Sequence, residues 1–450
     1  MKTKKIFYFL LLLGFLSGCD YLDIVPDNLP TLEMAFNNKS SAERFLFTCY
    51  SFVPEHGKIG TDPGMDVGDE VWYYSDNSAD YSNKTTFWIA KGMQNSNEPL
   101  VDYWNGTQWG KAMFVGIRDC NVFIENIDKV PDLSAYDKET WKAEVKVLKA
   151  FYHFWLMRMY GPIPIVKENI PVSADENEVR VVRDKIDDIV AYTVSLIDES
   201  VDYLPLNIQN EAAEMGRITR PAAKAIKAKI LAFAASPFFN GNLDYANFKN
   251  ADGEPFFNQV YDGEKWTKAA EACLDAIQCA EEAGHGLYEF VNMSSTKLSE
   301  ETVLSLTNRC KVTERWNKEL VWGCGQSGIR DLQVLCQPWL ESNYSSDDRY
   351  HNARNGTFAP TLAVAETFYT KNGVPMDEDR SYDYDNRYTT QVATEADKYY
   401  IQPGYTTAKL HFDREPRFYA TLGFDGSSWY GIGKMDDNDM WYLQAKAKQA

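Results

Sequence analysis

The sequence predicts a mostly α fold, in which a tetratricopeptide-like scaffold of helical pairs precedes an irregular, loop-rich C-terminal region with room for short strands. Apolar residues recur at helical spacing in several segments before residue 285, and links of Gly, Pro and Asn separate these segments. Beyond about residue 285 this spacing fades into short apolar stretches between Gly, Asn, Asp and Ser. No 34-residue repeat consensus is legible, so the pairing is inferred from helix size and link length.

The predicted helices follow one another along the chain. Residues Ser40 to Glu43 form a capping-box pattern that opens the first helix, which we expect to end near Val53. Gly161 and Pro162 predict the end of the third helix. Apolar stripes define the second to sixth helices in turn: Trp109, Met113, Ile117, Cys120, Ile124 and Ile127; Trp141, Val145, Leu148, Tyr152, Trp155 and Met159; Ile186, Val190, Ile197 and Val201; Ile226, Ile230 and Phe233; and Trp266, Ala270, Cys273, Ile277 and Ala280.

Composition and charge restrict the class of protein. The 450 residues include 46 Lys and Arg against 65 Asp and Glu, which gives a net charge of −19. Phosphate binding needs clustered basic residues, so this acidic excess argues against a nucleic-acid partner. The hydrophobic content of 44% is sufficient for a large packed core.

The first nineteen residues predict export and lipid attachment. Lysines precede an apolar run, from Ile6 to Leu16, that is too short to span a bilayer. Ser17 and Gly18 then stand before Cys19, as in a bacterial lipobox. We therefore expect residues 1–18 to be a lipoprotein signal peptide and Cys19 to carry the lipid. The alternative is an ordinary secretory signal followed by a chance cysteine.

The remaining cysteines predict neither a zinc site nor a complete disulfide framework. No pair among them shows CxxC spacing, and their number is odd once Cys19 is set aside. Cys120 and Cys273 lie on apolar stripes and are expected to be buried free thiols. A single disulfide between Cys324 and Cys336 stays open.

Signals for catalysis, cofactors and metals are weak. The sequence contains no GxxxxGK[ST], HExxH or GxSxG motif. Gly323 to Gly328 matches GxGxxG, but Pro338 follows too soon for a crossover helix and no βαβ periodicity surrounds it. Asp377 to Asp383 imitates a calcium loop, yet glycine and glutamate are missing from its sixth and twelfth positions. We expect no cofactor and no metal.

Five segments carry a resemblance to a known family. They are CDYLD at 19–23, KAEVKVLKAFYHFWLMRMYGPIPIV at 142–166, GRITRPAAKAIKAKI at 216–230, and FYTKNGVPM at 368–376 followed by DREPRFY at 413–419. In this order they resemble the signatures of the SusD/RagB family, surface lipoproteins of nutrient-uptake systems in Bacteroidetes. Glu415 stands where the family usually has Asp. The chain stops at Ala450, soon after the last signature, which indicates either a short member or a missing C-terminal part.

The resemblance implies residues 19–285 as a helical region with a ligand-loop insertion at about 54–105, and 286–450 as the family's C-terminal region. It further implies a lipid anchor on the cell-surface side of the outer membrane and a SusC-like TonB-dependent transporter as partner. The protein would capture oligosaccharides and pass them on without cutting them. The signature helices are structural in this reading, so the ligand site lies elsewhere.

The loops offer two aromatic groups that suit a sugar ligand. A sugar presents apolar C–H faces and a rim of hydroxyls, so its binder needs flat rings with polar side chains beside them. For each ring the alternative is loop packing, and we expect Trp88, Trp104 and the stripe tryptophans (Trp109, Trp141, Trp155 and Trp266) to be structural. The candidate rings are Trp72, Tyr73 and Tyr74 in one group and Trp316, Trp322 and Trp339 in the other.

Two other functions remain open at this stage. RagB-type relatives are associated with peptide uptake, and an acidic surface suits basic peptides. A lipid-anchored glycoside hydrolase needs two placed carboxylates, and nothing in the sequence marks one pair among its many acids.

Overall fold

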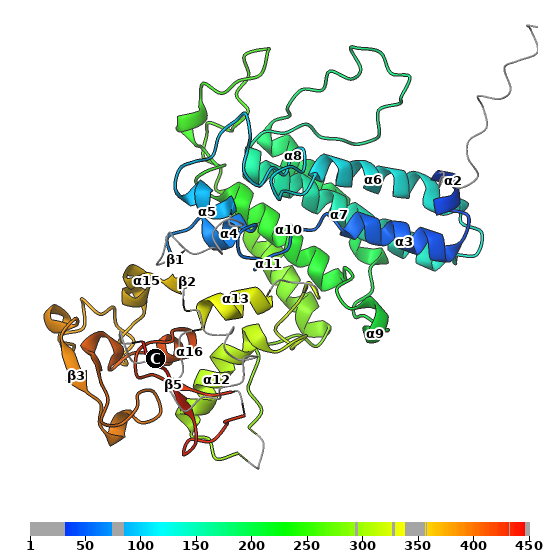
Figure 1. Cartoon of the computed structure of the whole chain (residues 1–450). Coiled ribbons are helices and arrows are strands. Elements are labelled where there is room, and N and C mark those ends of the chain that lie inside the picture. The colour runs from blue at the N-terminus through cyan, green and yellow to red at the C-terminus, as the bar shows by residue number, and fades with distance from the viewer. Residues whose placement is uncertain are drawn as a thin grey trace, which may run out of the picture.

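The computed structural model describes residues 32–73, 85–292, 296–325, 329–337, 356, 358–431 and 433–445, with only the backbone of residues 73, 329–331 and 334. Helices of the first 285 residues form the upper part of the molecule, and the C-terminal region lies below them (Figure 1). We call residues 32–285 the helical half. The expected mostly α architecture with a loop-rich C-terminal region is confirmed.

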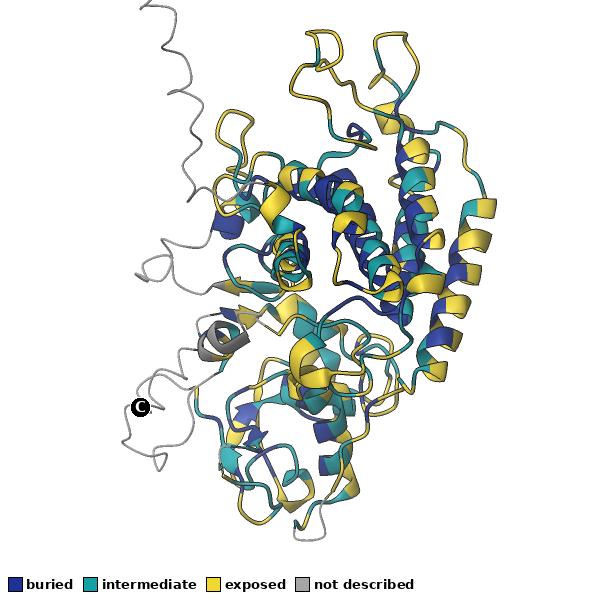
Figure 2. Cartoon of the chain, turned by 90° about the vertical axis from the view of Figure 1, so that its right-hand side faces the viewer, coloured by how far each residue is buried: buried dark blue, intermediate teal, exposed yellow. Residues whose placement is uncertain are grey.

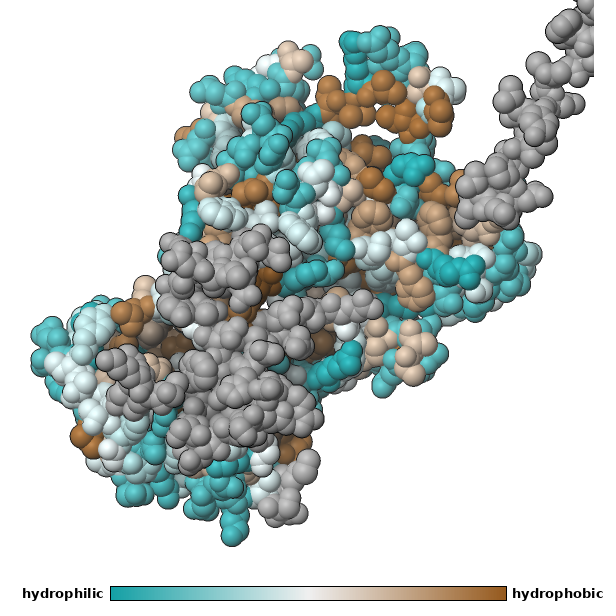
Figure 3. Space-filling model, in the orientation of Figure 1, coloured by the Kyte–Doolittle hydropathy of each residue, from teal (hydrophilic) through white to brown (hydrophobic). Residues whose placement is uncertain are grey.

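The helical half consists of long helices joined by links and short helical turns. Its helices are α2 (Leu32–Ala35), α3 (Lys39–Tyr50), α4 (Pro63–Asp66), α5 (Thr85–Ala90), α6 (Met113–Asn126), α7 (Ala135–Tyr160), α8 (Ile186–Asp198), α9 (Glu211–Glu214), α10 (Arg220–Ala235) and α11 (Glu264–Glu282). The loop between α7 and α8 rises above α6 and α8, and hydrophobic residues gather on it (Figure 3).

Helix α7 lies at the centre of the helical half. The Ser134 hydroxyl caps its first turn by accepting from the Asp137 N–H, and Gly161 ends it with a φ of 69° that favours glycine. Between these ends nearly every side chain from Thr140 to Met157 is buried, because α6 and α8 pack on either side. This helix anchors one continuous core, which appears dark blue in Figure 2.

Helices α10 and α11 approach each other through alanines. The buried residues of α11 are Ala269, Ala272, Ala276 and Cys279. The predicted inward stripe of this helix is therefore wrong: Trp266 is 45% exposed, Ile277 is 54% exposed, and Cys273 is also exposed. Small residues allow the two helices to pack closely, and the larger residues are left on the outer face.

Two other predictions for the helical half are corrected. The first helix begins one residue after Asn38, whose side chain accepts from the Ser41 N–H at 2.9 Å, so the predicted capping box is not the cap. Trp109 precedes α6 and is 61% exposed. It lies outside the helix because buried Asp102 accepts hydrogen bonds from the N–H groups of Trp104 and Asn105 and organises turns there instead.

The C-terminal region contains short elements and several small cores. Its helices are α12 (Glu300–Thr313), α13 (Ile329–Cys336), α15 (Leu362–Thr367) and α16 (Pro416–Thr421), and its strands are β2 (Phe358–Pro360), β3 (Thr390–Val392), β4 (Thr406–Ala408), β5 (Ser428–Trp429) and β6 (Trp441–Tyr442). The pairs β3–β4 and β5–β6 are antiparallel. Strand β2 pairs instead with β1 (Val71–Tyr73) from the helical half.

Hydrogen bonds to Arg414 join the two C-terminal signature segments. Its buried guanidinium donates to the carbonyl oxygens of Leu410 and Ala365, each at 2.8 Å, and of Phe368 at 2.6 Å. Glu415, at the position where the family usually has Asp, accepts from the Tyr369 N–H at 2.8 Å. The two signature segments are therefore structural, because side chains of the second, Arg414 and Glu415, satisfy backbone groups of the first.

Candidate functional site

A cavity of about 480 Å³ opens where the helical half meets the C-terminal region. The end of α3, the middle of α7, the turn before α10 and residues 320–325 all contribute to its walls. The lining includes the ring side chains of Phe47, Tyr50, His56, Phe151 and Trp322. The cavity thus combines aromatic surface from α3 and the loop after it, from α7 and from the stretch around residue 322.

A buried ionic cluster backs the cavity and fixes two of its lining residues. The Arg217 guanidinium meets both oxygens of Glu144, with Nη2–Oε1 at 2.5 Å and Nε–Oε2 at 3.0 Å. The Tyr50 hydroxyl donates to Glu144 at 2.6 Å and accepts from the Ile218 N–H at 2.9 Å. Burial acts to lower the pKa of Arg217, but the Glu144 carboxylate outweighs burial and raises it. The cluster joins the two helical signature segments and holds Tyr50 in place.

Trp322 is the predicted site residue that the structure places in the cavity lining. Its indole Nε1 donates to the Gly216 carbonyl oxygen at 2.9 Å. Its ring meets Phe151 edge-on, with centroids 5.5 Å apart. Trp322 is therefore a fixed, half-buried wall, and the part of its ring that lines the cavity is available to a ligand.

Trp316 supports this wall from behind. A Cβ built on Gly323 would lie 2.9 Å from its ring, and one built on Gly216 would lie 3.8 Å from it. Trp316 itself is half-buried, with a φ of 55°, and is not part of the cavity lining. Trp316 therefore packs against two glycines that line the cavity, and its contact with ligand stays a prediction.

The other predicted rings are only partly described. Trp72 lies on β1, is 39% exposed and packs on Phe87 with centroids 4.3 Å apart. For Tyr73 only the backbone is described, paired with Phe358, while Tyr74 and Trp339 lie outside the described residues. Trp88 is also 39% exposed, against our expectation of a packed ring. Trp72 and Trp88 thus present exposed rings near the β1–β2 pair.

Sequence reasoning missed the cavity residues that lie on or beside signature helices. Phe47, on α3, is 45% exposed, and Phe151 lies within the α7 signature that we expected to be structural. His56 follows α3 in an irregular stretch. Their common signal is weak, because each is a single ring on a different segment and only the fold brings them together. Cys324 and Cys336 are both free thiols, so the open disulfide is absent.

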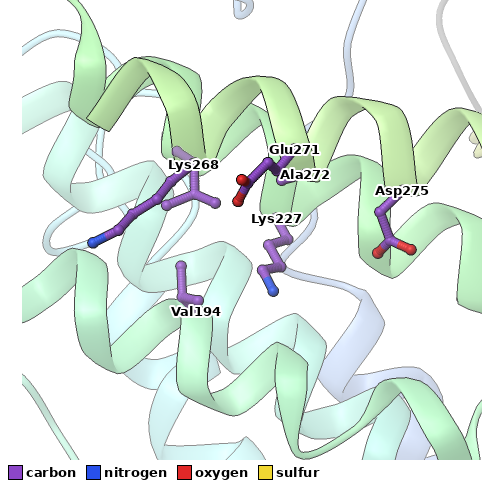
Figure 4. Close-up of a pocket in the computed structure, with 7 residues that line it drawn as sticks. Val194, Lys227, Lys268, Glu271, Ala272 and Asp275 are labelled. Carbon is purple, nitrogen blue, oxygen red and sulfur yellow. The ribbon is translucent and has the colours of Figure 1, made fainter. Parts of the chain in front are cut away.

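A second depression, between α8, α10 and α11, is a charged surface groove of about 320 Å³ (Figure 4). Lys227 lines it, and its Nζ lies 2.6 Å from Asp198. Asp275 pairs with Lys224 at 2.7 Å. Because these charges are paired between neighbouring helices, we interpret the groove as a gap between packed helices and not as a ligand site.

The calcium-like segment is organised by its own side chains. Asp379 accepts from the Thr370 hydroxyl at 2.5 Å and from the Asn372 amide at 2.9 Å. These bonds, and those from Ser381, lower the pKa of Asp379. Within the described ranges no cluster of three or more His, Cys, Asp or Glu could hold a metal ion.

Two family profiles match the chain. One, SusD-like and described as "Starch-binding associating with outer membrane", matches residues 20–231, and one of the SusD family matches residues 330–450. Among curated proteins, SusD-like protein P25 of Formosa agariphila is 22% identical over 240 residues, which is 51% of this chain. The match spans only 43% of that relative's length.

Solved structures show the same fold. The protein BT4246 is 26% identical to this chain and superposes with a TM-score of 0.72. The superposition covers 90% of this chain and 68% of BT4246. A SusD-like protein (BF3747) from Bacteroides fragilis has a TM-score of 0.60 at 16% identity, over 91% of this chain and 65% of its own. At 16% identity the second likeness is one of fold alone.

Proposed function

This chain belongs to the SusD/RagB family, and from that premise we propose that it captures oligosaccharides at the outer membrane and delivers them to a SusC-like TonB-dependent transporter. Carbohydrate binding and outer-membrane association follow from the family. The residues involved, the delivery step and the partner are our proposal.

The aromatic lining of the first cavity is the observation that carries this proposal. Phe47, which is 45% exposed, supplies apolar ring surface for the C–H face of a sugar, and His56 supplies a polar group at its edge. The volume of about 480 Å³ suits a ligand of a few sugar rings. We propose that Trp322 forms the fixed wall and that the exposed Trp72, with the neighbouring Tyr73, Tyr74 and Trp339, extends the platform.

A binding role without catalysis is favoured by the chemistry of the lining. Glycoside hydrolysis uses two carboxyl groups that flank the scissile bond. The described residues that line the cavity include no Asp or Glu, and the nearby Glu144 is engaged by Arg217 and Tyr50. The proposal is therefore capture without cleavage.

For location, we propose that lipid on Cys19 tethers the protein to the outer face of the outer membrane. Cys19 lies outside the described residues. In the part that is described, no helix combines the length and apolar character needed to cross a bilayer. The outer stripe of α11, with Trp266, Leu274 and Ile277 exposed, is a surface of the kind that partner binding covers, and we propose the transporter as that partner.

The test is a glycan array and a peptide library, followed by calorimetry with the best ligand of either kind. Phe47→Ala should weaken glycan binding by about three- to tenfold, since it removes a stacking ring. Tyr136→Ala is the matched control, because Tyr136 is 70% exposed and lies outside the cavity. Binding of peptides alone, release of reducing ends, or equal effects of the two substitutions would each overturn the proposal.

A further inference from the structure

A second cavity, of about 510 Å³, adjoins the first one at His56, which lines both. It lies between the loop of residues 56–67, the C-terminal half of α7 and the middle of α10. Trp155 and Arg158 come from α7 and Lys229 from α10. A chain held in the ring-lined cavity can therefore reach this second cavity past a single shared side chain.

Two cations face this second cavity without an ionic partner. The Arg158 guanidinium lies over the Trp155 ring, 4.1 Å from its centroid. Neither Arg158 nor Lys229 makes an ion pair or a hydrogen bond with any residue of the described ranges, whereas Lys224 and Lys227, on the same helix as Lys229, are both paired. The protein has a net charge of −19, so two cations without an ion pair on the same cavity are unexpected.

Asp62 lines the same cavity and attracts both cations electrostatically, but it forms no ion pair with either of them. Its oxygens accept from the Gly57 N–H at 3.0 Å and from the Gly64 N–H at 2.9 Å, and Oδ2 lies 3.3 Å from His56 Nδ1. Burial acts to raise the pKa of Asp62, but the hydrogen bonds from His56 and Gly57 outweigh it and lower the pKa. Asp62 is thus committed to holding the loop of residues 56–67.

The surroundings of the two cations disfavour their charged forms to some extent. Burial, and then the neighbouring Arg158, lowers the pKa of Lys229, and burial likewise lowers the pKa of Arg158. Arg158 is half-buried and Lys229 is exposed, so a ligand in this cavity can reach both a guanidinium and an ammonium, and together they suit an acceptor with several oxygens.

We infer that this second cavity binds the negatively charged group of an acidic sugar residue, a carboxylate or a sulfate ester, while neighbouring residues of the same oligosaccharide occupy the ring-lined cavity. The inference rests on the proposed function and names its ligand class. The oxyanion pairs with the Arg158 guanidinium and the Lys229 ammonium, and the arrangement disfavours a neutral sugar, which leaves both cations unpaired.

The test uses calorimetry with the mature protein and three trisaccharides of one length: trigalacturonate, its methyl ester, and a sulfated galactose trisaccharide. At least one acidic form should bind about tenfold more tightly than the ester. Lys229→Gln should remove most of that advantage, and because Lys229 is exposed this change leaves the core intact. Arg158→Gln provides a second variant, and Lys227→Gln, on the same helix but paired with Asp198, is the matched control.

Each outcome separates this inference from the proposed function. The two acidic arms tell a carboxylate from a sulfate as the source of charge. If ester and acid bind equally and Lys229→Gln has no effect, the acidic-sugar site is wrong while glycan capture stands. If no saccharide binds and an acidic peptide does, both fail. An equal loss in Lys229→Gln and Lys227→Gln would show only general electrostatic attraction and would also reject the site.

Discussion

The helical half and the C-terminal region are stabilised in different ways. Around α7 one continuous apolar core unites the packed helices, and the buried Glu144 of this helix is paired with Arg217. The C-terminal region has separate small clusters, and side chains that bond to backbone, Arg414 above all, tie its segments together. The comparison shows that the packed helices are stabilised by burial of apolar surface. The irregular C-terminal region depends instead on hydrogen-bond donors and acceptors at fixed positions.

The largest effect should come from removing a ring from the α7 core. Trp155→Ala should lower the free energy of unfolding by about 3–5 kcal/mol, because a fully buried indole leaves a cavity. Trp266→Ala, the same change on the exposed face of α11, should cost less than about 0.5 kcal/mol. Urea unfolding measures both. Equal costs would mean that α11 is covered and that the assigned faces are wrong.

Acidification should weaken both regions through one histidine in each, the buried His153 and the half-buried His411. His153 donates from Nδ1 to the Lys149 carbonyl at 2.8 Å and accepts at Nε2 from the Val166 N–H at 3.1 Å, so it must be neutral. Burial lowers its pKa to about 4, and burial likewise lowers the pKa of His411, in the C-terminal region, to about 4. Since each folded pKa lies below the unfolded value, this stability is complete above about pH 6.5 and is lost as the pH falls toward 4.

The measurement is the free energy of unfolding between pH 7 and pH 4. His153 alone should account for a loss of about 3 kcal/mol at the acid end. His153→Gln keeps a donor and an acceptor but does not titrate, so the difference between variant and parent should shrink as the pH falls. A difference that stays constant with pH would reject the neutral assignment of His153.

A smaller and local effect is expected in the C-terminal region. Arg414→Lys keeps the charge but cannot reach several carbonyl oxygens at once, so it should cost about 2 kcal/mol. Hydrogen exchange should speed up in the amides of 365–420 while α7 stays protected. Arg417→Lys, an exposed neighbour paired with Glu415, is the control and should change little. Loss of protection in α7 as well would show that the two regions unfold as one.

Periodicity predicted the helical half well where side chains are large on the buried face. The α7 stripe was right, with Trp141 and Trp155 both buried. It was wrong for α11, because alanines make the contact there and large side chains on the other face dominate the apolar pattern. Trp109 was misplaced because a turn built by Asp102 interrupts the same spacing.

The site was less predictable than the fold. Of the rings that composition singled out, Trp322 lines the cavity, Trp316 packs behind it, and Trp72 is exposed on β1. Phe47 and His56 could not be recognised, because nothing in their local sequence differs from ordinary helix and loop positions. What makes them a site is the meeting of segments far apart in the chain, and such contacts leave no short motif.

The pairing of β1 with β2 has a consequence for biogenesis. Val71 lies opposite Pro360, so the strand beside the first aromatic group gains its partner only after nearly three hundred further residues have been synthesised. A nascent chain that stops before this point carries an unpaired strand edge, which is open to aggregation. We therefore expect this part of the fold to form only once the last third of the chain has been synthesised.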